Sequence, residues 1–158
     1  MIGRLLHAGV FTFQALRRLI WFFTEPEVTG VHGIALTPDS KIVLVRLSYA
    51  SGWRLPGGGT KKTEDDTAAM VRELREEIGL SDYSGIHRVT DFEHRPDHRR
   101  GTGALFVVRD VRYRPQWSLE VKQVGEFWLD DLPVSTAKIT RQLIAMAGST
   151  LQVDPDAG

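Results

Sequence analysis

The sequence predicts an α/β domain in which a mixed β-sheet lies between helices. Short runs rich in β-branched and aliphatic residues recur along the chain, as they do in β-strands. One strongly patterned helical segment separates the early runs from the later ones. The length of 158 residues is typical of a single domain, which buries roughly two-thirds of the surface of its unfolded chain.

The composition excludes several classes of function. Lys plus Arg and Asp plus Glu both number 20, so the formal net charge is zero. Because binding to a long nucleic acid normally needs a basic excess, we expect no such partner. The chain contains no cysteine, which excludes disulfides, thiolate metal sites and a cysteine nucleophile. A chain without cysteine also suits a reducing compartment, and we expect a cytoplasmic location.

A first helix is predicted at residues 2–23, where apolar residues recur at helical spacing. Charged and polar residues interrupt it, so we expect neither a transmembrane span nor a signal peptide. We expect this helix to pack on the domain or on a second copy of the chain in a homodimer. A basic amphipathic helix that contacts a membrane surface is the alternative. The expected organisation is a helical extension (1–25), one domain (26–148) and a flexible tail (149–158).

Six strands and a last helix are predicted around the central helix. The strands are expected at residues 28–36, 41–47, 53–55, 83–93, 102–113 and 124–129. Residues 37–40 contain Pro, Asp and Ser, so they should connect the first two strands as a hairpin turn. Ser135 is expected to cap the last helix, which should run to about Met146.

The central helix follows three successive glycines at positions 57 to 59. Glycines allow a close approach of the backbone to a phosphate or a metal ion. Thr63 is the expected N-cap, acidic residues fill the first turn, and Gly79 should end the helix, which gives a span of about 64–78. At about 100° per residue, one stripe should face the core. That stripe consists of Thr67, Val71, Leu74 and Ile78.

Three carboxylates, Glu73, Glu76 and Glu77, are expected on the opposite side of this helix. Spacings of three and four residues bring their Cβ atoms within about 6 Å of one another. Like charges at that distance repel unless cations neutralise them, and oxygen ligands at this density suit Mg²⁺ or Mn²⁺. From the residues alone, a solvated acidic face with Arg72 paired to Glu76 is the alternative.

The whole string from Gly58 to Leu80 resembles the signature of the Nudix hydrolases, Gly-x5-Glu-x7-Arg-Glu-U-x-Glu-Glu-x-Gly-U, in which U is aliphatic. Every fixed position is filled: Gly58, Glu64 and the run Arg72-Glu73-Leu74-Arg75-Glu76-Glu77-Ile78-Gly79-Leu80. The lead-in at 53–58 and the stretch at 125–133 also look like elements of this family. The resemblance covers roughly residues 28 to 133 and implies the Nudix α/β/α sandwich with a mixed sheet, here with an extra N-terminal helix.

The resemblance also implies a reaction. Nudix hydrolases use Mg²⁺ or Mn²⁺ to cleave the phosphoanhydride bond of a nucleoside diphosphate linked to another moiety. The partner would therefore be a small nucleotide-derived substrate, such as an NDP-sugar, an ADP-ribose-like compound or an NTP. A catalytically idle nucleotide-binding or regulatory module of the same fold is the alternative, although an idle copy has no need to keep all three carboxylates.

The metal ligands implied by the resemblance are Glu73, Glu77 and the backbone carbonyl of Gly57, with Glu76 either a ligand or the general base. Arg72 would orient these carboxylates, through an interaction with Glu64. A general base from outside the helix is also possible. The candidates for it are Glu93, Glu120 and Glu126.

Four arginines are candidates for substrate binding: Arg46, Arg54, Arg95 and Arg99. The last two belong to the cationic loop 94–100, which is either a clamp for the diphosphate or a solvated hairpin turn. Tyr49, Trp53 and Phe92 are candidates to stack on a base, and packing is the alternative for each. The sequence leaves the identity of the substrate open.

Overall fold

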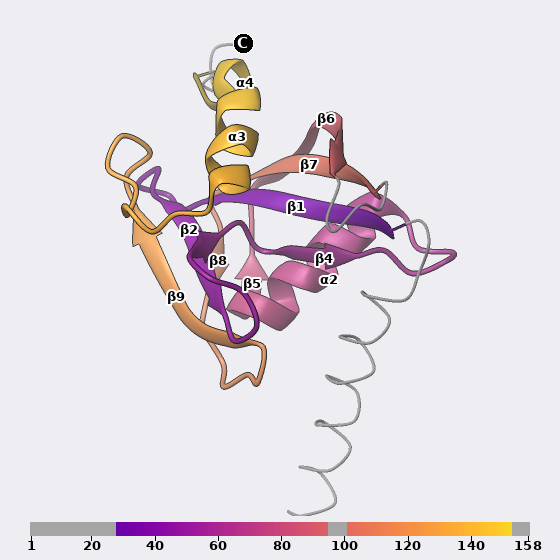
Figure 1. Ribbon diagram of the computed structural model, residues 1–158, viewed down its shortest axis with the longest axis horizontal. Coiled ribbons are helices and arrows are strands. Elements are labelled where there is room, and N and C mark those ends of the chain that lie inside the picture. The colour runs from indigo at the N-terminus through magenta and orange to yellow at the C-terminus, as the bar shows by residue number, and fades with distance from the viewer. Residues whose placement is uncertain (1–27, 95–100, 153–158) are drawn as a thin grey trace, which may run out of the picture.

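The computed structural model describes residues 28–94 and 101–152. A mixed β-sheet lies between α2 (Asp66–Ile78) on one face and α3 (Lys138–Met146) on the other, with α4 (Gly148–Gln152) continuing beyond α3 (Figure 1). This arrangement confirms the predicted sandwich. The predicted helix 2–23 and the residues 95–100 of the cationic loop lie outside the described part of the chain.

Seven strands form the main sheet, and two more form a small separate one. The main strands are β1 (Val28–Leu36), β2 (Ile42–Leu47), β3 (Trp53–Arg54), β4 (Gly57–Gly59), β6 (Gly85–His94), β7 (Gly101–Arg109) and β9 (Val121–Phe127). Their order is β3-β2-β1-β7-β6, with β4 paired to β1 and β9 paired to β2. The β1–β7 pair is parallel and the other pairs are antiparallel. The small sheet pairs β5 (Leu80–Asp82) with β8 (Arg112–Tyr113).

Strand β1 lies inside the sheet and packs on both faces. Val31 and Ala35 belong to the cluster under α2, whereas Ile34 and Leu36 belong to the cluster under α3. The segment was predicted as a strand because it is rich in β-branched and aliphatic residues. The predicted span 28–36 is confirmed, and the turn 37–40 connects it to β2 as expected.

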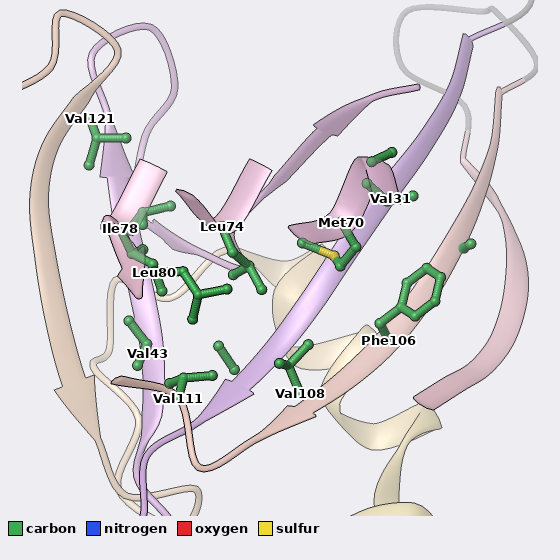
Figure 2. Close-up of a cluster of buried hydrophobic side chains, with 14 residues drawn as sticks. Val31, Val43, Met70, Leu74, Ile78, Leu80, Phe106, Val108, Val111 and Val121 are labelled. Carbon is green, nitrogen blue, oxygen red and sulfur yellow. The ribbon is translucent and has the colours of Figure 1, made fainter. Parts of the chain in front are cut away.

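Helix α2 packs on the sheet through Met70, Leu74 and Ile78, all fully buried (Figure 2). The predicted stripe was wrong at Thr67, which is exposed, whereas Val71 is half-buried and packs against the cluster under α2. The reason lies in the neighbouring glutamates, because the face that packs on the sheet also includes buried Glu73 and Glu77. A helical-wheel prediction that assigns only apolar residues to the buried face therefore leaves out Glu73 and Glu77.

The start of α2 also differs from the prediction. Asp65, not Thr63, is the N-cap, and the helix begins at Asp66. The Asp65 carboxylate accepts hydrogen bonds from the backbone N–H groups of Thr67 at 3.0 Å and Ala68 at 3.2 Å, so it satisfies two donors of the first turn. Gly79 ends the helix as predicted, at φ 74°, a conformation that favours glycine.

Other boundaries moved because the chain turns where the sequence showed a continuous pattern. The predicted strand 102–113 is two strands, since Asp110 adopts φ 53° and breaks the run between β7 and β8. The last strand is residues 121–127 rather than 124–129. Ser135 does not cap α3, whose N-cap is Ala137 without a side-chain hydrogen bond. The predicted tail from 149 is partly wrong, because α4 includes its first residues.

None of the helices in the described ranges has the length and hydrophobicity of a membrane span.

Candidate active site

The glycine strand β4 places the signature loop directly against α2. It runs antiparallel to β1, with Gly57 opposite His32 and Gly58 opposite Val31. A Cβ atom on Gly58 would lie only 2.6 Å from the Cδ atom of Glu73. A side chain at this position would therefore push the Glu73 carboxylate away, so the close approach of helix and strand requires glycine.

Glu77 links the helix to this strand through a backbone hydrogen bond. Its side chain is buried, with 5% of the residue exposed, and the N–H of Gly57 donates to its Oε2 atom at 2.8 Å. A buried carboxylate is stable only when hydrogen bonds or cations compensate for its lost hydration. The bond therefore holds the Glu77 carboxylate beside the first glycine of β4.

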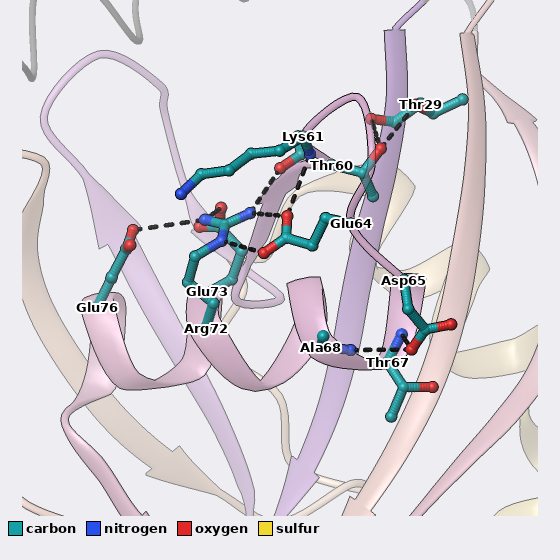
Figure 3. Close-up of polar contacts among 11 residues, drawn as sticks. Thr29, Thr60, Lys61, Glu64, Asp65, Thr67, Ala68, Arg72, Glu73 and Glu76 are labelled. Carbon is teal, nitrogen blue, oxygen red and sulfur yellow. Dashed lines mark hydrogen bonds and ion pairs between the residues drawn. The ribbon is translucent and has the colours of Figure 1, made fainter.

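Arg72 joins three parts of the site (Figure 3). Its Nε and Nη2 atoms bind the two oxygens of Glu64 at 2.7 and 2.9 Å, a bidentate pair. Its Nη1 atom donates to Oε1 of Glu73 at 2.5 Å, and Nη2 also donates to the carbonyl of Gly59 at 2.9 Å. A planar guanidinium fixes geometry better than a lysine ammonium would, so loop, strand and helix are held in one arrangement.

The charges of this cluster reinforce one another. The hydrogen bonds from Arg72 lower the pKa of Glu64 from 4.5 to about 2, helped by the backbone N–H of Lys61. The same bonds raise the pKa of Arg72 above its already high ordinary value, with the buried charge of Glu73 adding to the effect. Glu64 and Arg72 are therefore both ionised at neutral pH.

Glu76 differs from its two neighbours. Its side chain is 39% exposed, and its Oε2 atom lies 3.6 Å from Nη1 of Arg72. The expected outward face of three glutamates is therefore only partly right: Glu73 and Glu77 lie buried against β4, whereas Glu76 faces the solvent. The i,i+4 pair of Arg72 with Glu76, which was the alternative reading of the sequence, exists together with the buried contacts.

The donor set fits a hard divalent cation. Arg72 contacts Glu64, Glu73 and Glu76, so three carboxylates share one guanidinium. A fourth carboxylate, that of Glu77, lies one helical turn after Glu73. Such an excess of carboxylate oxygens suits Mg²⁺ or Mn²⁺. Within residues 28–94 and 101–152, however, no three acidic or histidine side chains already converge on one point that could hold a metal. Side-chain movement, easiest for exposed Glu76, would therefore accompany metal binding.

Of the four predicted substrate-binding arginines, the structure describes Arg46 and Arg54. The guanidinium of Arg46 lies 5.8 Å from the centre of the Trp53 ring and donates to Oε1 of Gln123 at 3.3 Å. Arg54 donates through Nε to the carbonyl of Ser51 at 3.3 Å. Neither takes part in the contacts of Arg72. Arg95 and Arg99 fall outside the described residues, so their binding role stays a prediction.

The candidate bases from outside α2 are not among the hydrogen-bond and ion-pair partners that the structure gives Arg72. Glu93 is exposed near the end of β6, and Glu120 is half-buried directly before β9. Glu126 accepts a hydrogen bond from the hydroxyl of Tyr113 at 2.8 Å. Burial, together with this carboxylate, raises the pKa of Tyr113, so the pair acts as a stable contact between β8 and β9.

Two features of the site were missed in the sequence. The carbonyl of Gly59 accepts from Arg72, and the N–H of Lys61 donates to Oε2 of Glu64 at 3.1 Å. The glycine run was a signal that backbone groups approach other atoms there, but it does not say which ones. Lys122 and Gln123 line a pocket together with residues of the loop after β2, and no motif marks them.

Solved structures of other proteins share this fold. The MutT NUDIX hydrolase from Burkholderia pseudomallei has a TM-score of 0.67 at 23% identity, over 77% of this chain and 98% of that chain. The NUDIX domain of Shewanella oneidensis NrtR, solved in complex with ADP ribose, has a TM-score of 0.66 at 21% identity, over 79% of this chain and 88% of that one. At these identities the likeness establishes the architecture.

Curated relatives match shorter segments. The m7GpppN-mRNA hydrolase dcap-2 of Caenorhabditis elegans is 30% identical over 98 residues, which are 58% of this chain and 12% of that protein. The RNA pyrophosphohydrolase of Methylococcus capsulatus is 45% identical over 49 residues, 30% of this chain and 26% of that protein. These matches thus span about a quarter or less of the relatives. The model of the NUDIX domain matches residues 26–144, most of the chain. The chain therefore belongs to the NUDIX family.

Proposed function

We propose that the protein is a hydrolase that depends on a divalent cation and cleaves the phosphoanhydride bond of a nucleoside diphosphate linked to another moiety. One observation carries this proposal: Glu73 and Glu77 are buried, 4% and 5% exposed, one turn apart beside a strand made of glycines. Burying two carboxylates so close together is costly in a protein that only needs a surface helix. A bound cation in their vicinity offsets that cost.

In this proposal Glu73, Glu77 and the carbonyl of Gly57 hold Mg²⁺ or Mn²⁺, and Glu76 is either a further ligand or the general base. The ion would neutralise the charge of the diphosphate and lower the pKa of a bound water. The hydrogen bond from the N–H of Gly57 to Glu77 supports this assignment, because it holds the Glu77 carboxylate next to the residue whose carbonyl is the other candidate ligand.

Arg72 acts here as a positioning residue. It holds the Glu73 carboxylate from one side, while Glu64 fixes the guanidinium by a bidentate pair. Because the pKa of Glu64 lies near 2, this pair stays charged through the whole range in which an enzyme works. Residues that orient a metal ligand commonly change metal affinity or activity by about 10- to 100-fold when they are replaced.

We assign the general base to Glu76 first. A base must reach a water molecule, and Glu76 is the one signature glutamate of α2 with a substantial exposed fraction. Glu93 and Glu120 are the alternatives, since both have solvent access. The Gln variants of these three residues, compared by their pH–rate profiles, distinguish them: the acidic limb of the profile, which reports protonation of the base, should disappear for the true base.

The relatives support a substrate that contains a diphosphate. One similar structure is a complex with ADP ribose, and several relatives are RNA pyrophosphohydrolases. We propose a small nucleotide-derived substrate, because the net charge of zero does not favour a long polyanion. The wild-type protein should release phosphate or a nucleoside monophosphate from at least one member of a panel of NDP-sugars, ADP-ribose and NTPs.

The decisive experiment is the variant Glu77→Gln, assayed against this panel while Mg²⁺ is titrated. A metal ligand contributes several kcal/mol to the transition state, so turnover should fall about 100-fold or more. Asp131→Asn is the matched control, because it also removes one negative charge, at an exposed position after β9. This control variant should leave turnover unchanged. Circular dichroism should show the same fold for all three proteins.

Two results would contradict the proposal. If Glu77→Gln turns over as fast as the wild type, the carboxylate is not part of the site. If the wild type binds members of the panel but releases no product with either Mg²⁺ or Mn²⁺, the idle nucleotide-binding module is the better description.

A further inference from the structure

Three large apolar side chains, here called the Trp117 patch, are exposed on two neighbouring loops. Trp117 and Leu119 lie on the loop between β8 and β9 and are 83% and 43% exposed, and Tyr49, on the loop after β2, is 49% exposed. The loops are joined, because the N–H of Ser48 donates to the carbonyl of Glu120 at 2.7 Å. Figure 1 shows both loops at the end of the sheet away from α4. Exposed apolar groups that gather in this way mark sites that contact a partner or a membrane.

The loop that carries Trp117 is anchored on both sides of this residue. Before it, the N–H of Arg114 donates at 3.0 Å to the carbonyl of Gly79, the residue that ends α2. After it, the hydroxyl of Ser118 accepts from the N–H of Glu120 at 3.1 Å. The backbone that presents Trp117 is therefore already ordered, so little backbone entropy is lost when this side chain is buried against a partner.

The surroundings of the Trp117 patch are basic. The two loops and the strand ends beside them, residues 46–52 and 112–123, contain one acid, the half-buried Glu120. They contain four exposed cations: Arg46, Arg112, Arg114 and Lys122. Over the whole chain, by contrast, basic and acidic residues are equal in number. The last three of these cations form no ion pair among the residues that the structure describes, so their charges are available to an anionic partner.

This combination of side chains matches the surface of an anionic membrane. Trp and Tyr are favoured at the boundary between lipid and water, and each Lys or Arg near an anionic surface adds attraction. Leu119 favours lipid over a single-stranded nucleic acid, because an aliphatic side chain gains from leaving water but offers no ring on which a base can stack. Lys122 favours lipid over an apolar protein surface, since Lys is depleted in the buried parts of protein interfaces.

We propose that the Trp117 patch is a docking surface for an anionic lipid bilayer. Trp117, Leu119 and Tyr49 enter the headgroup region, and the exposed cations beside them contact lipid phosphates. The bond from Arg114 to Gly79 brings the end of α2 close to the lipid surface. This docking surface is separate from the helix predicted at residues 2–23. It also does not depend on the hydrolase proposal, because docking requires no turnover.

The test measures binding of the full chain to vesicles in EDTA, which prevents divalent cations from bridging acidic side chains to lipid phosphates. A flotation assay compares vesicles of phosphatidylcholine with vesicles that also contain phosphatidylglycerol. The wild type should bind the anionic vesicles and not the neutral ones, and added salt should weaken the binding. Brominated lipids in the anionic vesicles should quench the tryptophan fluorescence, which reports that an indole ring enters the bilayer.

The apolar part of the patch is tested at Trp117. Trp117→Ala should weaken binding to anionic vesicles about tenfold or more, because it removes the largest apolar group of the patch. The same variant should lose the quenching by brominated lipids. Trp128→Ala is the matched control, since Trp128 is 49% exposed but follows the far end of β9. A strand of this length places it roughly 20 Å from the start of β9, so this control should bind and be quenched like the wild type.

The basic part of the patch is tested at Lys122. Lys122→Gln should weaken binding to anionic vesicles about fivefold, because one cation near the lipid surface is lost. Lys138→Gln is the matched control: it removes an exposed lysine at the start of α3 and should bind like the wild type. Circular dichroism and thermal unfolding should show that all four variants are folded.

Three results would overturn the inference. The first is a wild type that does not bind anionic vesicles or binds neutral ones equally well. The second is a Trp117→Ala variant that binds as tightly as the wild type, because another segment, such as residues 2–23, then contacts the lipid. The third is a wild type that binds a single-stranded RNA oligonucleotide more tightly than vesicles and needs Trp117 to do so, which makes the patch a nucleic-acid surface.

Vesicle binding and turnover fail independently. Glu77→Gln should bind anionic vesicles like the wild type while losing turnover. A protein that hydrolyses its substrate but ignores vesicles would refute the docking surface and leave the hydrolase proposal standing. A protein that needs Trp117 to bind vesicles but turns over no substrate would do the reverse.

Discussion

Among the described residues, Arg72 and Arg88 each contact more than one carboxylate, Arg72 in a largely buried cluster and Arg88 on the surface. Arg72, whose side chain is 17% exposed, binds Glu64 and Glu73. Arg88, whose side chain is 48% exposed, binds Asp66 at 2.8 Å and Asp91 at 2.5 Å. The contact distances in the two clusters are similar, yet only the first cluster is largely removed from water.

The difference shows that distance alone does not set the importance of an ion pair. Charges that remain hydrated gain little from pairing and are screened by salt, typically leaving less than about 1 kcal/mol. A buried partner that loses its counterion has no water to replace it, so its removal costs much more. We therefore expect Arg72 to matter for both stability and activity, and Arg88 to matter for neither.

The largest effect is expected for Arg72→Met. The substitution keeps most of the volume but leaves the buried Glu73 carboxylate and its partner Glu64 without the guanidinium. The free energy of unfolding should fall by about 3 kcal/mol. Turnover should fall roughly 10- to 100-fold, because a metal ligand loses its support. Urea unfolding and product release measure the two effects. A variant as stable as the wild type would show that burial does not distinguish the clusters.

The next effect concerns the pH dependence of the same cluster. The pKa of Glu64 is lowered from 4.5 to about 2, so its pairing stabilises the fold above about pH 5, and this contribution is lost as the pH falls toward 2. Glu64→Gln should therefore be less stable than the wild type by about 2 kcal/mol at pH 7, with allowance for solvent screening. The gap should shrink toward acid pH. Unfolding curves from pH 7 to pH 2 test this, and a gap that is constant with pH would contradict it.

A smaller effect is expected at the start of α2, next to the surface cluster. Asp65→Ala removes the acceptor for the N–H groups of Thr67 and Ala68 and should lower the free energy of unfolding by about 1 kcal/mol. Thr63→Ala is the matched control, because Thr63 is exposed and does not serve as the cap. If thermal unfolding shows the same loss of stability for both variants, the hydrogen bonds of Asp65 do not specifically stabilise the start of α2.

The smallest effect is expected for Arg88→Ala, which should change the free energy of unfolding by less than about 1 kcal/mol. The reason is that Arg88, Asp66 and Asp91 all keep contact with solvent. A double-mutant cycle of Arg88→Ala with Asp66→Asn measures the coupling directly and should return a small value that vanishes in high salt. A coupling as large as that between Arg72 and Glu64 would remove the distinction between the two clusters.

Local spacing in the sequence was enough to predict the central helix, its end at Gly79, and the set of acidic residues that it carries. It also predicted the buried strand β1 and the alternation of strands and helices that makes a sandwich. The contact of Arg72 with Glu64 was expected from the family resemblance, and the structure brings the two residues together. The metal and catalytic roles of these residues stay predictions.

Local spacing failed where the answer depended on a distant partner. It placed Glu73 on an outward face, because a helical wheel treats every carboxylate as a surface group. It missed the β5–β8 pair and the parallel pairing of β1 with β7, since both join segments more than twenty residues apart. It also chose Thr63 as the cap, although Asp65 offers the stronger acceptor at the first turn.

The sequence by itself determined which groups exist and at what intervals: three glycines, one arginine and a set of glutamates on a helix. Only the tertiary structure decided that Glu73 and Glu77 are buried while Glu76 is exposed, because burial depends on how β4 pairs with β1 and how α2 packs on them. The pocket beside Tyr49 was likewise decided by the fold, since two segments more than seventy residues apart line it. Intervals along a chain set local geometry, but the removal of a charge from water is a property of the whole fold.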